Sequence, residues 1–333
     1  MMHKLLYTAR TWLLKGACNL VRPFARFDPT ENLLVFSDPR GGSTWLAEML
    51  MTVPRTVLLW EPLNVANVSF FDDLNFSLRQ YVPPDADWEE ARQRFERLFR
   101  GDLIDHWTCQ DPIGLARAER MVVKVCRGNA LLPWMSATFD LAYEPVYLVR
   151  HPFAVVASQL RYGAWEDYEG FEVPKGPFDS YYREHEAYVQ SLETVYEGLV
   201  AQWCLTNLVP LRSPRNDVDW ITVYYEDLLA DSDAQIRRIF DRWRMEPPPG
   251  IFAAAGRASS TTRRATFNDD VNRQLSKWMA YFDDEAVDRM MAVLDHFGVS
   301  EYGRDVRPLQ GTTGSTSGAA ASSCGDERAC RNE

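Results

Sequence analysis

Short apolar runs that alternate with stretches of helical length constrain the fold of this chain most. Five runs have the length and composition of buried β-strands: residues 33–37 (LLVFS), 56–60 (TVLLW), 121–125 (MVVKV), 145–149 (PVYLV) and 219–223 (DWITV). Helical patterns lie between and after them, at 43–52, 88–100, 129–138, 152–161, 181–210, 231–243 and 284–297. This alternation is typical of an α/β protein with a parallel sheet. The sequence has no internal repeat, and the order βαβα over about 300 residues predicts one α/β domain with long inserts.

The two ends of the chain differ from this central part, so we place the domain at residues 31–308. The tail, residues 309–333, is of low complexity, and we expect it to be disordered. The leader, residues 1–30, interleaves basic and apolar residues and has no acid before Asp28. It fits three interpretations: a signal peptide interrupted by basic residues, a basic amphipathic helix on an anionic membrane surface, or a helix that packs on the domain.

Composition and charge exclude several classes of protein. A hydrophobic content of 46% is enough for a real core. The formal net charge of −11 argues against a nucleic-acid partner, so an anionic ligand would need a local basic pocket. The six cysteines form no CxxC pair and have no histidine at metal-ligand spacing, which favours a reducing compartment over disulfides or zinc. No run reaches the roughly 18 apolar residues of a spanning helix, so we expect a cytoplasmic protein, with membrane contact only through the leader. The sequence leaves the oligomeric state open.

A glycine-rich loop follows the first predicted strand, where residues 37–50 read SDPRGGSTWLAEML. The free N–H groups at a helix start attract anions, and paired glycines let the backbone curl around one. Arg40 adds a guanidinium suited to phosphate. A Walker A loop needs a lysine before its Ser or Thr, but here Gly42 is followed directly by Ser43. The loop therefore predicts an anion site without the kinase lysine, and with no metal ligands evident we expect no bound metal.

A second anion site is predicted after the strand at 145–149. Residues 147–159 read YLVRHPFAVVASQ, which places Arg150 at the carboxyl end of the strand. Ser158 lies two turns into the helix that follows. Together these two side chains can hold a second phosphate at some distance from the glycine-rich loop.

Two phosphate clamps on one parallel sheet resemble the sulfotransferase family that uses 3′-phosphoadenosine-5′-phosphosulfate. The 5′-phosphate clamp matches PRGGSTWL (39–46), and the 3′-phosphate clamp matches LVRHPFAVVASQ (148–159). Further segments resemble carbohydrate 6-O-sulfotransferases: LLWEPLN (58–64), VVKVCRG (122–128), AQWCLTN (201–207) and VYYEDLLAD (223–231). The resemblance covers about residues 35–300. It departs from the family at His151, where relatives usually carry Asp, and in having no Golgi-type membrane anchor.

The resemblance implies a single P-loop-like domain, with a central, mostly parallel sheet flanked by helices. It also implies transfer of the sulfuryl group from 3′-phosphoadenosine-5′-phosphosulfate, without metal, to a hydroxyl acceptor, first of all a carbohydrate. The donor contacts that it implies are Arg40, Gly41, Gly42, Ser43, Thr44, Trp45, Arg150 and Ser158. Two candidates come from a late segment, RASSTTRRATF (257–267): Arg263 and Arg264, with Ser259 and Ser260 behind them. The alternative for this segment is a solvated surface loop.

Three residues are assigned catalytic roles. Arg40 would stabilise the leaving phosphate oxygen, unless it only caps a surface turn. Lys124 would neutralise sulfuryl or phosphate oxygens, and lysine is rare inside an apolar strand unless it has such a task. Glu61 is the candidate general base, because partial burial after its strand would raise its pKa. The alternative for Glu61 is a buried ion pair with Lys124 or Arg127.

Other functions remain open at this stage. The acceptor could be a lipid, a polyketide or a phenol. A P-loop kinase or a non-catalytic nucleotide-binding protein would share the glycine-rich loop. The inserts at 64–87 and 162–180 lie after strands of the site, which predicts that they form the acceptor pocket. For the aromatic residues at 162–182, packing in the core is the alternative to a lid over the acceptor.

Overall fold

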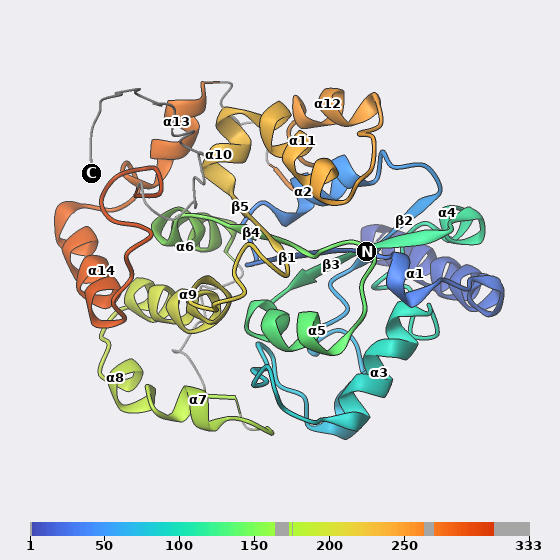
Figure 1. Ribbon diagram of the computed structural model, residues 1–333, viewed down its shortest axis with the longest axis horizontal. Helices are drawn as coiled ribbons and strands as arrows, with labels where there is room; N and C mark the ends of the chain where they lie inside the picture. Colours follow the sequence, from blue (N-terminus) through green and yellow to red (C-terminus); the bar gives the residue numbers. More distant parts are fainter. Residues whose placement is uncertain (1, 164–172, 175, 263–269, 310–333) are drawn as a thin grey trace, which may run out of the picture.

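A computed structural model describes residues 2–163, 173–174, 176–262 and 270–309. The described chain contains a five-stranded sheet in the order β2-β3-β1-β4-β5, and all its pairings are parallel. The strands are β1 (Leu33–Ser37), β2 (Thr56–Trp60), β3 (Arg120–Cys126), β4 (Val146–Val149) and β5 (Ile221–Tyr224). All five predicted strands are therefore confirmed, with shifts only at their ends. Because β1 is central, the loop after it lies between the loops that follow β3 and β4 (Figure 1).

Helices cover both faces of this sheet (Figure 1). The longer ones are α1 (Met2–Val21), α2 (Ser43–Leu50), α3 (Glu89–Phe99), α5 (Leu132–Thr138), α6 (Pro152–Tyr162), α9 (Val195–Leu211), α11 (Ser232–Arg242) and α14 (Asp284–His296). The shorter ones are α4 (Pro112–Arg117), α7 (Ser180–Arg183), α8 (Glu186–Gln190), α10 (Tyr225–Ala230), α12 (Gly250–Ala255) and α13 (Val271–Leu275). Short 3₁₀ turns include η1 (Arg22–Phe24), η2 (Pro29–Glu31), η3 (Asp72–Leu74), η4 (Asn129–Leu131) and η6 (Ser276–Trp278).

The predicted long helix at 181–210 is wrong. The chain there forms three helices, α7, α8 and α9. The last of them begins at a capping box: the Thr194 hydroxyl accepts from the Glu197 N–H, and the Glu197 carboxylate accepts from the Thr194 N–H. This reciprocal pair of hydrogen bonds satisfies backbone N–H donors at a helix start. A new helix therefore begins here, although the apolar pattern continues without a break.

The apolar core has two parts, one on each face of the sheet. On one face, side chains of α2, α11 and α12 pack against Leu33 and Val35 of β1. On the other face, α5, α6, α9 and α14 pack against Leu34 and Phe36 of the same strand. Because successive strand side chains point to opposite faces, a strand covered on both sides is buried at every position, as β1 is, and its residues 33–36 are all apolar.

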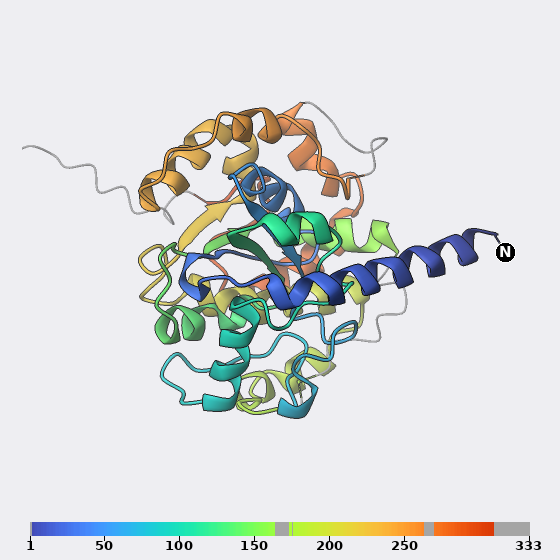
Figure 2. The same cartoon turned by 90° about the vertical axis from the view of Figure 1, so that its right-hand side faces the viewer.

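The predicted leader forms helix α1, which extends away from the body of the molecule (Figure 2). Near its carboxyl end it packs on the domain, where the buried Cys18 thiol donates to the Cys109 carbonyl oxygen at 3.3 Å. Leu13 and Leu20 remain exposed. None of the described helices is both long and apolar enough to cross a bilayer. Contact of α1 with a membrane surface stays a prediction.

Core packing is the correct interpretation for most described aromatic residues of the insert at 162–182. Tyr182 is buried and its hydroxyl donates to the Arg79 carbonyl oxygen. The Tyr181 hydroxyl donates to the Leu205 carbonyl oxygen, and Phe178 packs on Trp88. The remaining aromatic residues that the sequence analysis considered there, Trp165, Tyr168 and Phe171, lie outside the described residues, as does the tail from residue 310.

Candidate functional site

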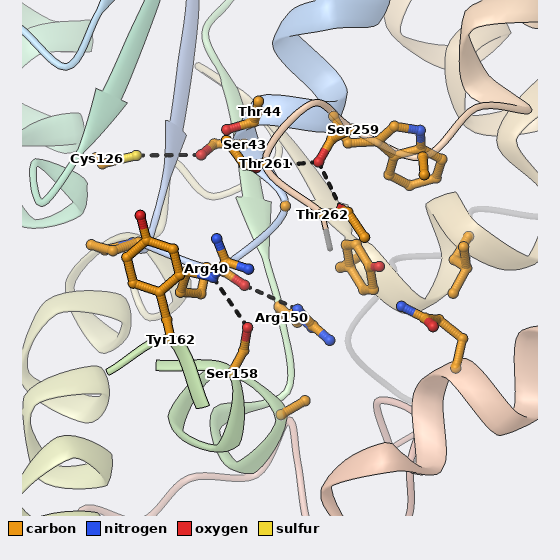
Figure 3. A pocket seen from close by; sticks show the side chains of 18 of the residues that line it. Arg40, Ser43, Thr44, Cys126, Arg150, Ser158, Tyr162, Ser259, Thr261 and Thr262 are labelled. Atoms are coloured by element: carbon orange, nitrogen blue, oxygen red, sulfur yellow. Dashed lines mark hydrogen bonds between the residues drawn. The ribbon is translucent and has the colours of Figure 1, made fainter. Parts of the chain in front are cut away.

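One cavity of about 610 Å³ lies at the carboxyl edge of the sheet, where the chain leaves β1 to β4. It brings together most of the predicted site residues, which lie on elements far apart in the sequence (Figure 3). Those that line it are Arg40, Gly42, Ser43, Thr44, Trp45, Glu61, Lys124, Arg150 and Ser158. Gly41 is not among the lining residues. The candidates Arg263 and Arg264 lie outside the described residues.

The loop between β1 and α2 has the geometry of an anion site. Gly42 is the N-cap of α2, at φ +103°. Because glycine has no side chain, the cap residue accepts no side-chain hydrogen bond from the N–H groups of the first turn, and these N–H groups can donate to an anion. A Cβ at Gly42 would lie 2.6 Å from the Tyr225 ring. A Cβ at Gly41 would lie 2.3 Å from the Ser37 hydroxyl oxygen. Both glycines are therefore required by close packing, and Gly41 acts through the shape of the loop.

Arg40, in the first predicted clamp, contacts both predicted residues of the second clamp. Its Nε donates to the Ser158 hydroxyl at 3.2 Å, and its guanidinium lies 4.9 Å from the Tyr162 ring centroid. The Arg150 Nη1 donates to the Arg40 carbonyl oxygen at 3.0 Å (Figure 3). The two clamps are thus neighbours in one cavity. Arg40 also has φ +70°, a left-handed backbone that residues other than glycine seldom adopt.

The second clamp is built on the turn between β4 and α6. The guanidinium of Arg150 lies over the Tyr225 ring at 4.3 Å. His151 is the N-cap of α6: its Nδ1 accepts from the Phe153 N–H, and its Nε2 lies 3.1 Å from the Gly303 carbonyl oxygen, to which it donates. Burial lowers the pKa of His151 to about 4, so the ring is neutral. The His151 side chain therefore caps the helix.

Glu226 accepts a hydrogen bond from the backbone of this turn and was not predicted as a residue of the site. One carboxylate oxygen accepts from the His151 N–H at 2.9 Å, and the other accepts from the Tyr302 hydroxyl at 3.1 Å. Burial raises the pKa of Glu226 from 4.5 to about 7. The carboxyl lies in the segment VYYEDLLAD (223–231), whose sequence gave no sign of this contact.

Replacing Glu226 with glutamine should change how stability depends on pH. Because the native pKa is raised, the native state binds more protons than the unfolded state between pH 4.5 and about 7, and its stability falls as pH rises through this range. Glutamine removes the titration but keeps an oxygen for the His151 N–H. We expect the stability of Glu226→Gln, relative to the wild type, to rise by roughly 2 kcal/mol between pH 5 and pH 8, measured by urea unfolding. An equal difference at both pH values would contradict the assignment.

Glu61 forms two ion pairs at the ends of β2 and β3. Its Oε1 accepts from Lys124 Nζ and its Oε2 from Arg127 Nη1, each at 2.9 Å. Lys124 is buried and its Nζ lies 3.4 Å from the centroid of the Trp60 ring. Burial acts to raise the pKa of Glu61, but Lys124 and Arg127 outweigh it and the pKa is lowered. The expected rise in this pKa is therefore wrong, whereas the alternative, an ion pair of Glu61 with Lys124 or Arg127, is confirmed, with both cations on the one carboxylate.

The cavity is strongly basic although the chain as a whole is acidic. Its basic lining residues are Arg40, Lys124, Arg127, Arg150, Arg161, Arg257 and Lys277. Glu61 is the only acid among the described residues that line it. In a chain of net charge −11, this local excess of positive charge selects for a ligand with several negative charges.

Several lining residues were missed by the sequence analysis. Arg257 lines the cavity a few residues before the predicted Arg263, and Thr261 and Thr262, which were also not predicted, line it together with the predicted Ser259. The Ser260 N–H instead donates to the Glu48 carboxylate, and Ser260 does not line the cavity. The polar, basic composition of 257–267 predicted a wall of the site, and the described residues of that segment, 257–262, line the cavity with the exception of Ser260.

An apolar part of the same cavity could hold a flat ring. It is lined by Trp45, Leu229, Ala255, Val271 and Leu275. The Trp45 Nε1 donates to the Ala255 carbonyl oxygen at 3.2 Å, which fixes the indole at one side. No group of three or more His, Cys, Asp and Glu side chains that could hold a metal ion is found in the part of the chain that the structure describes.

The chain is similar, at low identity, to solved sulfotransferase structures. The sulfotransferase domain from the Synechococcus PCC 7002 olefin synthase is 16% identical, with 81% of this chain and 95% of that domain covered and a TM-score of 0.44. The sulfotransferase domain from the curacin biosynthetic pathway is 15% identical, with 80% and 98% covered and a TM-score of 0.42. Mouse sulfotransferase SULT7A1, complexed with PAP, is 14% identical, with 85% and 87% covered and a TM-score of 0.39.

No family model matches the chain, and no curated protein does. TM-scores below 0.5 at such identities do not establish membership of a family.

Proposed function

We propose that this chain is a sulfotransferase that transfers the sulfuryl group of 3′-phosphoadenosine-5′-phosphosulfate to a hydroxyl. The observation that carries the proposal is the placing of two anion clamps, the loop at Arg40 and the turn at Arg150, in one basic cavity. A ligand with phosphate groups at both ends of an adenosine satisfies both clamps at once. A single phosphate leaves one of them unused.

The residues present fit such a donor. The N–H groups at the start of α2, with the hydroxyls of Ser43 and Thr44, would hold the 5′-phosphate. Arg150 and Ser158 would hold the 3′-phosphate, and the apolar wall near Trp45 would cover the base. When bound, the donor supplies the transferable sulfuryl group.

The chain's own contribution to transfer is positioning and charge stabilisation. Arg40 and Lys124 are the cations placed to stabilise negative charge on the departing phosphate and on the sulfuryl oxygens. Glu61 is the candidate acceptor of the proton from the attacking hydroxyl, and its lowered pKa keeps it ionised at neutral pH. An anion that binds Lys124 weakens the ion pair between Lys124 and Glu61. The pKa of Glu61 then rises, so Glu61 becomes a stronger base than it is without the anion.

The acceptor side of the cavity is lined by Trp60, Asn64, Trp107 and Tyr162, next to Glu61. Aromatic faces beside an amide suit a ring that carries hydroxyl groups. We therefore place a carbohydrate first, as the resemblance of LLWEPLN (58–64) to carbohydrate sulfotransferases implies. A lipid, polyketide or phenol hydroxyl is the alternative.

Thermal unfolding with two nucleotides tests the proposal. A ligand that binds only the native state stabilises it by about 2.7 kcal/mol at a concentration of 100 times its Kd. We expect 3′-phosphoadenosine-5′-phosphate to raise the Tm, and ATP with magnesium to raise it far less. Stabilisation by ATP with magnesium alone would favour a kinase, and no shift with either nucleotide would contradict the proposal. A screen of hydroxyl acceptors with labelled donor would then identify the acceptor.

A further inference from the structure

Helix α9 runs behind both anion clamps and bonds to each of them. It is apolar and buried along most of its length. Two of its buried side chains, Trp203 and Asn207, are one turn apart and therefore share a face. The Trp203 Nε1 donates to the Arg150 carbonyl oxygen at 3.1 Å, and the Asn207 Nδ2 donates to the Asp38 carboxylate at 2.6 Å.

The amide of Asn207 is held in one orientation. Its Oδ1 accepts from the Tyr147 hydroxyl at 2.7 Å and from the Asn129 amide at 3.0 Å, so its nitrogen must face Asp38. The carbonyl oxygen of Asp38 accepts from the Gly41 N–H at 2.9 Å, which closes the turn that carries Arg40. Asn207 therefore anchors the base of the first clamp.

Trp203 anchors the second clamp through the backbone. It holds the carbonyl group of Arg150, whose side chain reaches back to the Arg40 carbonyl oxygen. A helix is a rigid element with a fixed rise per residue. The two anchors therefore cannot move apart without breaking a hydrogen bond in the interior, where an unpaired group costs the full desolvation penalty.

We infer that Trp203 and Asn207 are positioning residues that fix the separation of the two clamps, and so make the site prefer a nucleotide with two phosphate groups over one with a single phosphate. The inference rests on the proposed function, since it concerns the same site. It also gives a task to the segment AQWCLTN (201–207), which the proposed chemistry does not use. When the two clamps already have the right separation, less free energy is lost in ordering their side chains as both phosphates bind.

The variant Trp203→Phe tests the inference, because it keeps an aromatic ring and removes only the N–H donor and part of the ring. We expect the affinity for 3′-phosphoadenosine-5′-phosphate, measured by calorimetry, to fall about five-fold, which corresponds to one lost hydrogen bond. The affinity for 5′-AMP, which needs only the first clamp, should stay within about two-fold of the wild type. The ratio of the two affinities is the readout, because a general loss of stability would not change it.

A matched control is Trp220→Phe. Trp220 is also buried, and its Nε1 has no hydrogen-bond partner among the described residues. This variant should retain the wild-type ratio. An equal change of the ratio in Trp220→Phe and Trp203→Phe, or an unchanged ratio in both, would overturn the inference.

The other anchor is tested by Tyr147→Phe, a mild change that removes one bond to the Asn207 oxygen and leaves the packing in place. Here the first clamp is loosened, so the affinity for 5′-AMP should fall about three-fold while that for 3′-AMP stays the same. The same loss for both mononucleotides would overturn the inference. If the wild type binds none of these nucleotides, the proposed function fails instead, and the two failures are thus distinguishable.

Discussion

Replacing Arg40 with alanine is expected to lower the rate of sulfuryl transfer by about 100-fold or more. Arg40 is the cation of the first clamp; its Nε donates to the Ser158 hydroxyl, and its guanidinium lies over the Tyr162 ring. Removing a group that stabilises charge in the transition state affects kcat more than ground-state binding. Initial rates with labelled donor, together with the Kd of 3′-phosphoadenosine-5′-phosphate, would measure both quantities.

The control for Arg40→Ala is Arg120→Ala. Arg120 is the first residue of β3, at the opposite edge of the sheet, and it also pairs with a carboxylate, Glu31, and lies over a tyrosine ring. Its loss should leave kcat unchanged. If Arg40→Ala kept more than about a tenth of the wild-type rate, Arg40 would have no part in charge stabilisation.

The second large effect is expected for Glu61→Gln, which should lower kcat by about 100-fold or more while donor affinity changes little. Glutamine keeps the shape of the side chain but cannot take the proton of the acceptor hydroxyl. The lowered pKa gives a further expectation: the acid limb of the wild-type kcat/KM profile, which reports the protein without bound substrate, should lie below the ordinary glutamate value of 4.5. The stability that the ion pairs contribute should be lost in the same low pH range.

Glu61→Gln also removes the negative charge between two cations, so we expect it to destabilise the fold by about 3 kcal/mol. Glu31→Gln is the matched control, since it breaks the ion pair with Arg120 far from the cavity. That variant should keep its rate. A wild-type kcat in Glu61→Gln would limit Glu61 to the role of an ion-pair partner.

The sheet was predictable because its signal is local. Every residue of Leu33–Ser37 is buried, and a strand covered on both faces is mostly apolar, as the run 33–36 is. The anion loop was predictable for the same reason, since its glycines and hydroxyls lie within a few residues of each other. The break before α9 was missed because no glycine or proline marks it, and the capping box at Thr194 was read as part of a continuing helix.

Electrostatic properties of the site were less predictable because they depend on neighbours from other strands. The pKa of Glu61 is set by its burial and by Lys124 and Arg127, of which the first lies in β3 and the second directly follows it. The position of Glu226 beneath the second clamp likewise depends on how β4 and β5 pair. The sequence shows which side chains can ionise. The fold determines which of these side chains lie next to each other, and so the direction in which each pKa is shifted.

The backbone at the strand ends limits how this protein can be engineered for heat resistance. Three adjacent strands, β1, β2 and β3, are each followed by a residue with a left-handed backbone. These residues are Arg40 (φ +70°), Glu61 (φ +40°) and Arg127 (φ +70°). Each such residue costs of order 1 kcal/mol, which glycine would avoid. Selection for a higher melting temperature alone would therefore favour glycine where the charged side chains are needed. Libraries aimed at robustness should hold these three codons fixed.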